Sequence, residues 1–208
     1  MQRSIERRNV NRITQLDPTR ATGKVKQLFD EVQARIGAVP NVFRVLGNAP
    51  AALKGYLNFD GALAGGSFNK KIREQIALAV AESNLCGYCL SAHTFIGGRA
   101  GLTKKEIADA GRAVAATAKT EAILKLARDI VVQRGEVSDA DLEHARASGL
   151  TDGEIVETVA NVALNILTNY VNHVACTVVD FVEVKLGEAD LNRVQNQTGA
   201  DYDSAEHN

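Results

Sequence analysis

The stretch from residue 74 to residue 93 reads EQIALAVAESNLCGYCLSAH. Within it, Cys86 and Cys89 stand in CxxC spacing, His93 follows Cys89 by four residues, and Glu74 precedes Cys86 by twelve. The whole chain has only three cysteines and four histidines, so these groups are concentrated in one short segment. Thiol redox chemistry requires a nucleophilic sulfur, a second sulfur that can close a disulfide, and groups that move protons. This stretch therefore predicts a redox-active thiol site.

The first half of the stretch is expected to be an enclosed helix. On a helix that begins near Lys70, the residues on both sides are apolar or small, so little of its surface can face water. Glu74 on such a helix requires a partner or loses its charge. The alternative is that Glu74 reaches solvent from the first turn, where the helix dipole favours a negative charge.

The second half is expected to open a further helix with the cysteines at its start. A helix N-terminus can hold Cys86 and Cys89 at disulfide distance, and its free N–H groups favour a thiolate. His93 then lies one turn beyond Cys89 on the same face and can take the thiol proton. A histidine that only satisfies hydrogen bonds in the core is the alternative. Tyr88 either packs in the core or links Glu74 to the thiol site through its hydroxyl.

Helical periodicity runs through the rest of the chain, and strand signals are nearly absent. Capping boxes are expected at residues 103–106 and 151–154, and Asp17-Pro18 is a typical helix start. We expect one all-α domain spanning residues 1–208, with an N-terminal arm over about 1–16 and a polar, disordered tail over about 195–208. Besides the helices that begin at the two capping boxes, helices are expected at 18–36, 41–46, 51–63, 70–84, 86–96, 120–133, 139–147 and 155–186.

The composition excludes several classes of protein. With a formal net charge of −1 and 45% hydrophobic residues, the chain has no basic excess that would favour nucleic-acid binding. Polar residues interrupt the apolar stretch 155–186, so we expect no membrane span, and no apolar segment follows the N-terminal arginines as in a secretory signal. Three cysteines do not make an extracellular disulfide framework, which favours a cytoplasmic protein. The same apolar stretch exceeds what one helical layer can cover and predicts a homo-oligomer.

The pattern Glu-x11-Cys-x2-Cys-x3-His resembles the alkylhydroperoxidase D family, also called the carboxymuconolactone decarboxylase superfamily. The segments IGAVPNVF at 36–43 and NILTNYVNH at 165–173 are similar to its peroxidase-related branch. The resemblance spans roughly residues 12 to 190 and implies an alkylhydroperoxidase D-like helical bundle that assembles as a trimer or hexamer.

The resemblance also implies roles for the site residues. Cys89 would attack the hydroperoxide substrate, Cys86 would resolve the sulfenic acid as a disulfide, and Glu74 and His93 would belong to the proton relay. Well-known members have a second histidine where this chain has Tyr88. The reaction would need no cofactor and no metal, and an external dithiol reductant, which the sequence does not identify, would restore the pair.

Three other functions remain open from the sequence. Cys86, Cys89 and His93 could bind zinc, with Glu74 or His173 as the fourth ligand. The pair could also act as a redox sensor or binding protein without turnover. A decarboxylase or lactone-acting enzyme is the third alternative, although that activity does not depend on a CxxC pair.

The remaining polar side chains are expected to contribute less. Cys176 is predicted to be a small buried hydrophobe and His173 a satisfied core histidine. Three asparagines in the C-terminal helix are expected to bond one another or a neighbouring helix, and the alternative is that they line the pocket. Those three are Asn165, Asn169 and Asn172, and the two histidines expected to be exposed are His144 and His207.

Overall fold

The computed structural model describes residues 11–187, and within them all of the regular secondary structure is helical, without a β-strand. The all-α prediction is therefore confirmed for this part of the chain. The predicted tail at 195–208, with His207, and the first ten residues of the arm lie outside the described residues. The helices are α1 (Gly23–Ile36), α2 (Asn41–Leu46), α3 (Pro50–Ala64), α4 (Lys70–Ser83), α5 (Gly87–Arg99), α6 (Lys104–Gly111), α7 (Ala118–Val132), α8 (Asp139–Ala147) and α9 (Asp152–Ala175).

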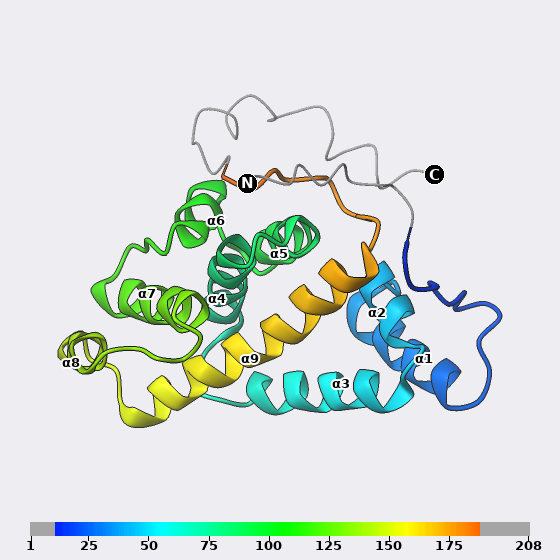
Figure 1. Cartoon of the computed structure of the whole chain (residues 1–208), viewed down its shortest axis with the longest axis horizontal. Coiled ribbons are helices and arrows are strands. Elements are labelled where there is room, and N and C mark those ends of the chain that lie inside the picture. The colour runs from blue at the N-terminus through cyan, green and yellow to red at the C-terminus, as the bar shows by residue number, and fades with distance from the viewer. Residues whose placement is uncertain (1–10, 188–208) are drawn as a thin grey trace.

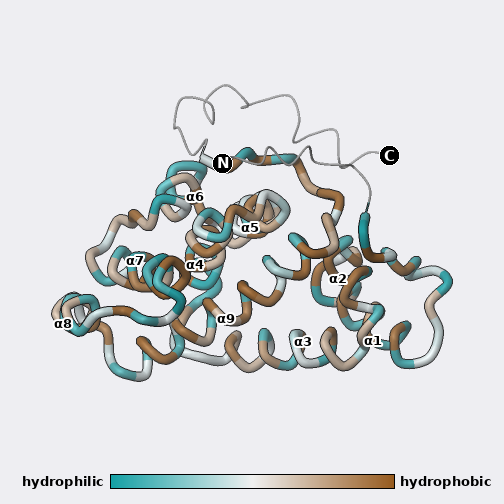
Figure 2. The backbone as a smooth tube through the Cα atoms, in the orientation of Figure 1, coloured by the Kyte–Doolittle hydropathy of each residue, from teal (hydrophilic) through white to brown (hydrophobic). Residues whose placement is uncertain are grey.

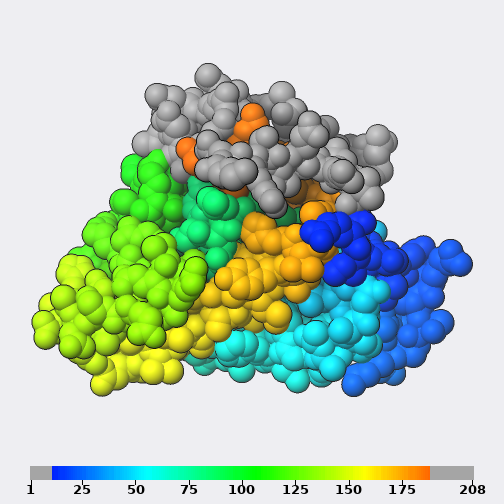
Figure 3. Space-filling view, viewed as in Figure 1, coloured from blue at the N-terminus to red at the C-terminus, as the bar shows by residue number. Residues whose placement is uncertain are grey.

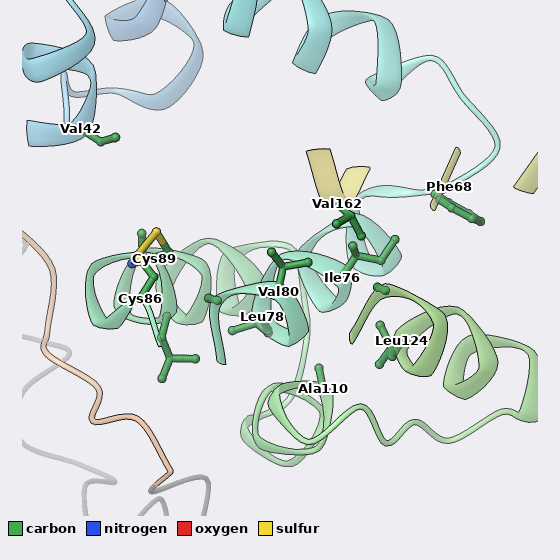
Figure 4. Close-up of a cluster of buried hydrophobic side chains, with 14 of the residues drawn as sticks. Val42, Phe68, Ile76, Leu78, Val80, Cys86, Cys89, Ala110, Leu124 and Val162 are labelled. Atoms are coloured by element: carbon green, nitrogen blue, oxygen red, sulfur yellow. Dashed lines mark hydrogen bonds between the residues drawn. A yellow bond between two sulfur atoms is a disulfide. The ribbon is translucent and has the colours of Figure 1, made fainter. Parts of the chain in front are cut away.

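Helix α4 lies at the centre of the fold, as its enclosed pattern predicts. It packs against α5, α6, α7 and α9. Seven consecutive residues of α4, Gln75 to Ala81, are buried. A helix buried on all sides can hold its neighbours in a fixed arrangement, because interiors are close-packed. Figure 4 shows Ile76, Leu78 and Val80 of α4 within one hydrophobic cluster that also contains Cys86 and Cys89.

Helix α9 crosses the molecule diagonally between two groups of helices. In Figure 1, α4 to α8 lie on one side of it and α1 to α3 lie on the other. It packs against α2, α3, α4, α5 and α7, so it joins both groups. The predicted capping box that starts it is confirmed, because Thr151 and Glu154 satisfy each other's backbone N–H groups. The capping box of Thr103 and Glu106 at α6 is confirmed as well.

The loop that enters α4 is held by a carboxylate of α9. Glu157 accepts hydrogen bonds from the backbone N–H groups of Ser67 at 2.8 Å and Phe68 at 3.1 Å. Burial raises the pKa of Glu157, but these two N–H groups lower it, and the net shift of the pKa is downward. The beginning of α4, and with it Glu74, is thereby fixed against α9.

The prediction that the C-terminal helix continues to residue 186 is wrong. Helix α9 ends at Ala175, where Cys176 takes the left-handed conformation with φ 49°. The next residues, 177–187, run without regular structure over α5 and α2 and are rich in β-branched valine, which lowers helix propensity. Their backbone finds tertiary partners instead: the N–H of Val184 donates to Ser91 Oγ at 2.9 Å. Hydrophobic residues recur along both α9 and this C-terminal segment (Figure 2).

The predicted start of the first helix is also wrong. Asp17 does not cap a helix, because its side chain accepts the N–H of Thr19 at 2.9 Å and closes a local turn. Helix α1 begins only at Gly23. Among the described residues, no helix combines the length and the apolar character that a bilayer crossing requires.

Candidate active site

The turn from α4 to α5 places the two cysteines together. Leu85 takes a positive φ of 55°, which redirects the chain so that Cys86 becomes the N-cap of α5. Cys86 and Cys89 form a disulfide, with their Cα atoms 5.3 Å apart, a separation in the ordinary range for disulfides. The backbone N–H of Cys89 donates to Cys86 Sγ at 3.3 Å. The sequence expectation that a helix start holds the pair at bonding distance is confirmed.

The two sulfurs differ in what they face. Both residues are only 2% exposed to outside solvent. Cys89, however, lines a partly open cavity of about 630 Å³ between α4, α5, α9 and the first three helices, whereas Cys86 is not part of its wall. A molecule in this cavity can therefore contact Cys89 but not Cys86.

Glu74 and His93 form a hydrogen-bonded pair in the wall of the same cavity. Nδ1 of His93 lies 2.8 Å from Oε2 of Glu74, and the side chains are 18% and 14% exposed, respectively. Glu74 comes from α4 and His93 from α5, so the packing of these two helices brings them together. His93 follows Cys89 by one helical turn, which places imidazole and sulfur along the same cavity wall. The enclosed Glu74 has the partner that its position in α4 requires.

Tyr88 has a different partner from the one its linking role would require. Its hydroxyl donates to Asp180 Oδ1 at 2.7 Å and accepts the backbone N–H of Val42 at 3.2 Å. Burial, together with the charge of Asp180, raises the pKa of this phenol far above its usual value. The Tyr88 ring packs edge-on against Phe181, with centroids 5.8 Å apart. The hydroxyl therefore ties α5 to α2 and to the C-terminal segment, and it does not bond Glu74.

Asn172 of α9 contacts the sulfur that faces the cavity. Its Nδ2 donates to Cys89 Sγ at 3.3 Å, and its side chain lies in the cavity wall. Asn161 and Asn165, on the same face of α9, also line the cavity. The recurrence of asparagine at helical spacing singled out this face in the sequence, but nothing local indicated the sulfur as a partner. Asn169 faces elsewhere and accepts a hydrogen bond from Asn84 at 3.1 Å.

The other sequence candidates lie away from the cavity. The expectation for His173 is corrected, because it is exposed and its Nε2 lies 2.9 Å from the carbonyl oxygen of Asn84. Cys176 is half-buried at the end of α9 and is not bonded to another cysteine. His144 is exposed, as predicted. Within residues 11–187, no three side chains of the histidine, cysteine or carboxylate type are grouped as a metal site.

Comparisons with known proteins agree with this architecture. Residues 50–132 match the sequence model of the carboxymuconolactone decarboxylase family. A peroxidase-related protein with an alkylhydroperoxidase AhpD core from Ralstonia eutropha JMP134 is similar at 26% identity and TM-score 0.70, over 81% of this chain and 91% of that one. A peroxidase-related protein from Silicibacter sp. TM1040 is similar at 23% identity and TM-score 0.67, over 81% of this chain and 92% of that one.

A debrominase provides a further likeness in fold. A cysteine-to-alanine variant of the debrominase Bmp8, in complex with 2,3,4-tribromopyrrole, superposes with TM-score 0.71 at 14% identity, over 81% of this chain and 91% of that one. No sequence among the curated proteins matches this chain.

Proposed function

We propose that this chain, whose residues 50–132 match the carboxymuconolactone decarboxylase family, is a thiol-dependent peroxidase of the alkylhydroperoxidase D-like superfamily that reduces hydroperoxides with the Cys86–Cys89 pair. One observation carries the proposal. The sulfur of Cys89 faces a cavity whose wall also contains the Glu74–His93 pair, and the second sulfur lies behind it within disulfide reach. A nucleophile and a proton acceptor thus share one space, and a resolving thiol lies within bonding distance of the nucleophile.

The reaction begins with the reduced pair. Cys89 transfers its thiol proton to His93, whose Nδ1 is oriented by Glu74 and whose Nε2 remains for proton exchange. The thiolate attacks the terminal oxygen of the hydroperoxide, so the S–O bond forms while the O–O bond breaks. The leaving alkoxide takes the proton from His93 and departs as an alcohol. Cys89 is then a sulfenic acid.

The second half of the cycle closes the disulfide. The Cys86 thiol attacks the sulfenic sulfur, the S–S bond forms, and the hydroxyl leaves as water after taking the thiol proton. The disulfide of this structure corresponds to that product. An external dithiol returns two electrons and two protons by thiol–disulfide exchange, and a reducing compartment such as the cytoplasm would supply it.

The test follows oxidation of the purified, pre-reduced chain by tert-butyl hydroperoxide with dithiothreitol as reductant. Cys89→Ser is expected to abolish consumption of the hydroperoxide. Cys86→Ser is expected to accumulate a sulfenic acid at Cys89 that a dimedone probe traps. Cys176→Ser is the control, because that thiol lies outside the site, and it should turn over like the unchanged chain. A sulfenic acid trapped at Cys86 in Cys89→Ser, with none trapped at Cys89 in Cys86→Ser, would reverse the assigned roles.

Two competing outcomes are read in the same assay. A debrominase has this fold, and oxidation of a dithiol to a disulfide supplies two electrons for reductive dehalogenation as well as for peroxide reduction. Bromide release from a brominated pyrrole without hydroperoxide consumption would favour that activity. One stoichiometric oxidation without turnover, whichever reductant is offered, would favour a redox sensor.

We also propose that the chain forms a homo-oligomer through α9. On the face of α9 turned away from the core, hydrophobic side chains recur at helical spacing and remain 40–68% exposed: Val156, Val159, Leu167, Tyr170 and Val174. Figure 3 shows α9 at the molecular surface between α3 and the α7–α8 region. An apolar stripe of this length on a surface helix is typical of an interface. Light scattering of the unchanged chain is expected to give the mass of a trimer or hexamer. The Leu167→Glu variant should have a lower mass, because it places a charge in the stripe. A monomeric mass of the unchanged chain across micromolar concentrations would contradict the proposal.

A further inference from the structure

The side chain of Asn172 is buried where α9 contacts the sulfur of Cys89. Asn172 is 5% exposed, and its Nδ2 lies 3.3 Å from Cys89 Sγ. A buried amide normally satisfies both of its polar atoms. Here the second atom, Oδ1, is fully buried and has no hydrogen-bond partner among the described residues. The residue also lines the cavity. Nδ2 therefore donates to the sulfur, and the unpaired Oδ1 belongs to a residue of the cavity wall.

The donor has a direct consequence for the thiol. An N–H group that donates to a sulfur stabilises the thiolate more than the neutral thiol, and it lowers the pKa of that cysteine. The N-cap position already provides such a donor to Cys86, from the backbone N–H of Cys89. Cys89 receives its donor from another helix, through Asn172. In this disulfide state, the donor to Cys89 Sγ therefore comes from α9, through a tertiary contact.

The acceptor matches the chemistry of a hydroperoxide. The terminal oxygen that the thiolate attacks carries the O–H group of the substrate. An acceptor on the same planar amide, beside the sulfur, can hold that O–H group while the sulfur approaches the same oxygen. Such positioning converts an encounter into an oriented attack.

We propose that Asn172 is a catalytic residue of the thiol site: Nδ2 stabilises the Cys89 thiolate, and Oδ1 receives the O–H of the bound hydroperoxide. The first part concerns the thiol alone, whereas the second part rests on the proposed peroxidase function. The bonds made and broken are those of the peroxidase cycle. Asn172 forms no covalent bond and neither gains nor loses a proton.

The experiment separates the two parts. Cys86→Ser/Cys176→Ala leaves Cys89 as the sole thiol, and its titration is followed by thiolate absorbance at 240 nm. Asn172→Leu in this background keeps the shape and removes the donor, so the pKa of Cys89 is expected to rise by about one to two pH units. Asn172→Asp, also of similar shape, should raise it too and provides the test if the leucine variant does not fold. Asn169→Leu is the matched control, because Asn169 is equally buried on α9 but bonds Asn84; it should leave the pKa of Cys89 unchanged.

The rate of oxidation by tert-butyl hydroperoxide tests the acceptor. At a pH where Cys89 is fully ionised in every variant, the ionised fraction no longer limits the rate, and a thiolate of higher pKa is the better nucleophile. Loss of the donor alone should therefore leave the Asn172→Leu plateau rate equal to or above that of the Asn172 parent, whereas loss of the substrate contact as well should bring it below. An unchanged pKa in the Asn172 variants would overturn the first part, and a plateau rate equal to or above that of the parent would overturn the second. A raised pKa in a protein that never consumes hydroperoxide would uphold the first part and contradict the proposed function.

Discussion

Removal of the Tyr88 hydroxyl should lower the stability of this protein while leaving its thiol chemistry nearly intact. In Tyr88→Phe, the backbone N–H of Val42 loses its partner in the first turn of α2, where no intrahelical acceptor exists. A buried N–H without a partner costs about 1–2 kcal/mol. The bond to Asp180 contributes about 1 kcal/mol more, because this exposed carboxylate regains water when the phenol is lost.

The expected loss is therefore about 2–3 kcal/mol in the free energy of unfolding, which corresponds to a fall of roughly 4–12 °C in melting temperature for a chain of this size. The C-terminal segment should stay attached, since Asp180 also accepts the N–H of Asn41 at 2.9 Å. Thermal denaturation followed by circular dichroism measures the difference. His144→Ala is the control, because that side chain is exposed on α8 and lies outside the proposed interface, and it should melt like the unchanged chain.

The rate of Cys89 oxidation in the same variant distinguishes a structural hydroxyl from a proton relay. Because the pKa of the Tyr88 phenol is raised, it stays protonated and donates to Asp180 at neutral pH. We expect the oxidation rate to change less than about fivefold, equivalent to less than about 1 kcal/mol. If Tyr88→Phe melts at the same temperature as the unchanged chain but its Cys89 is no longer oxidised by peroxide, this reasoning is refuted and Tyr88 belongs to the proton relay.

Three further outcomes are expected. His93→Ala should slow peroxide oxidation of Cys89 by about 10²-fold in stopped-flow measurements, whereas His144→Ala, an exposed control, should not. Mild peroxide should leave Cys176 open to alkylation while the CxxC pair forms its disulfide, and a peptide that links Cys176 would contradict this. Because the folded-state pKa of Glu157 is lowered, its ionised form stabilises the fold above the ordinary carboxyl range, and this stabilisation is lost as pH falls through the lowered pKa. The melting-temperature gap between the unchanged chain and Glu157→Gln should therefore narrow on acidification from pH 6 to pH 3, and a constant gap would show that the charge does not contribute.

Local patterns in the sequence were sufficient for most helices. Helix α2 and helix α8 begin and end at the predicted residues, and the two predicted capping boxes form. These features depend on interactions within three or four residues along the chain, so the sequence expresses them directly. The chemistry of the site was readable for the same reason, because CxxC and the following histidine lie within two helical turns.

The start of the first helix and the end of the last helix were not readable from periodicity. The stretch after Ala175 is as apolar as the helix before it, and only tertiary partners such as Ser91 decide that it leaves the helix. Asp17 has the right residue type for a cap, but it closes a turn with Thr19 instead. In both cases a competing hydrogen bond replaces the helical one, and its energy depends on contacts that periodicity does not contain.

The sequence by itself determined an all-α protein with two close thiols, a histidine one turn away, and an enclosed carboxylate that needed a partner. Only the tertiary structure decided which sulfur faces the cavity, that the partner of Glu74 is His93, that the Tyr88 hydroxyl bonds Asp180, and that Asn172 reaches Cys89. Asn172 and Cys89 are 83 residues apart. Contacts at such separation arise from how α9 packs across α4 and α5, and side-chain spacing along one helix carries no information about the helix it will meet.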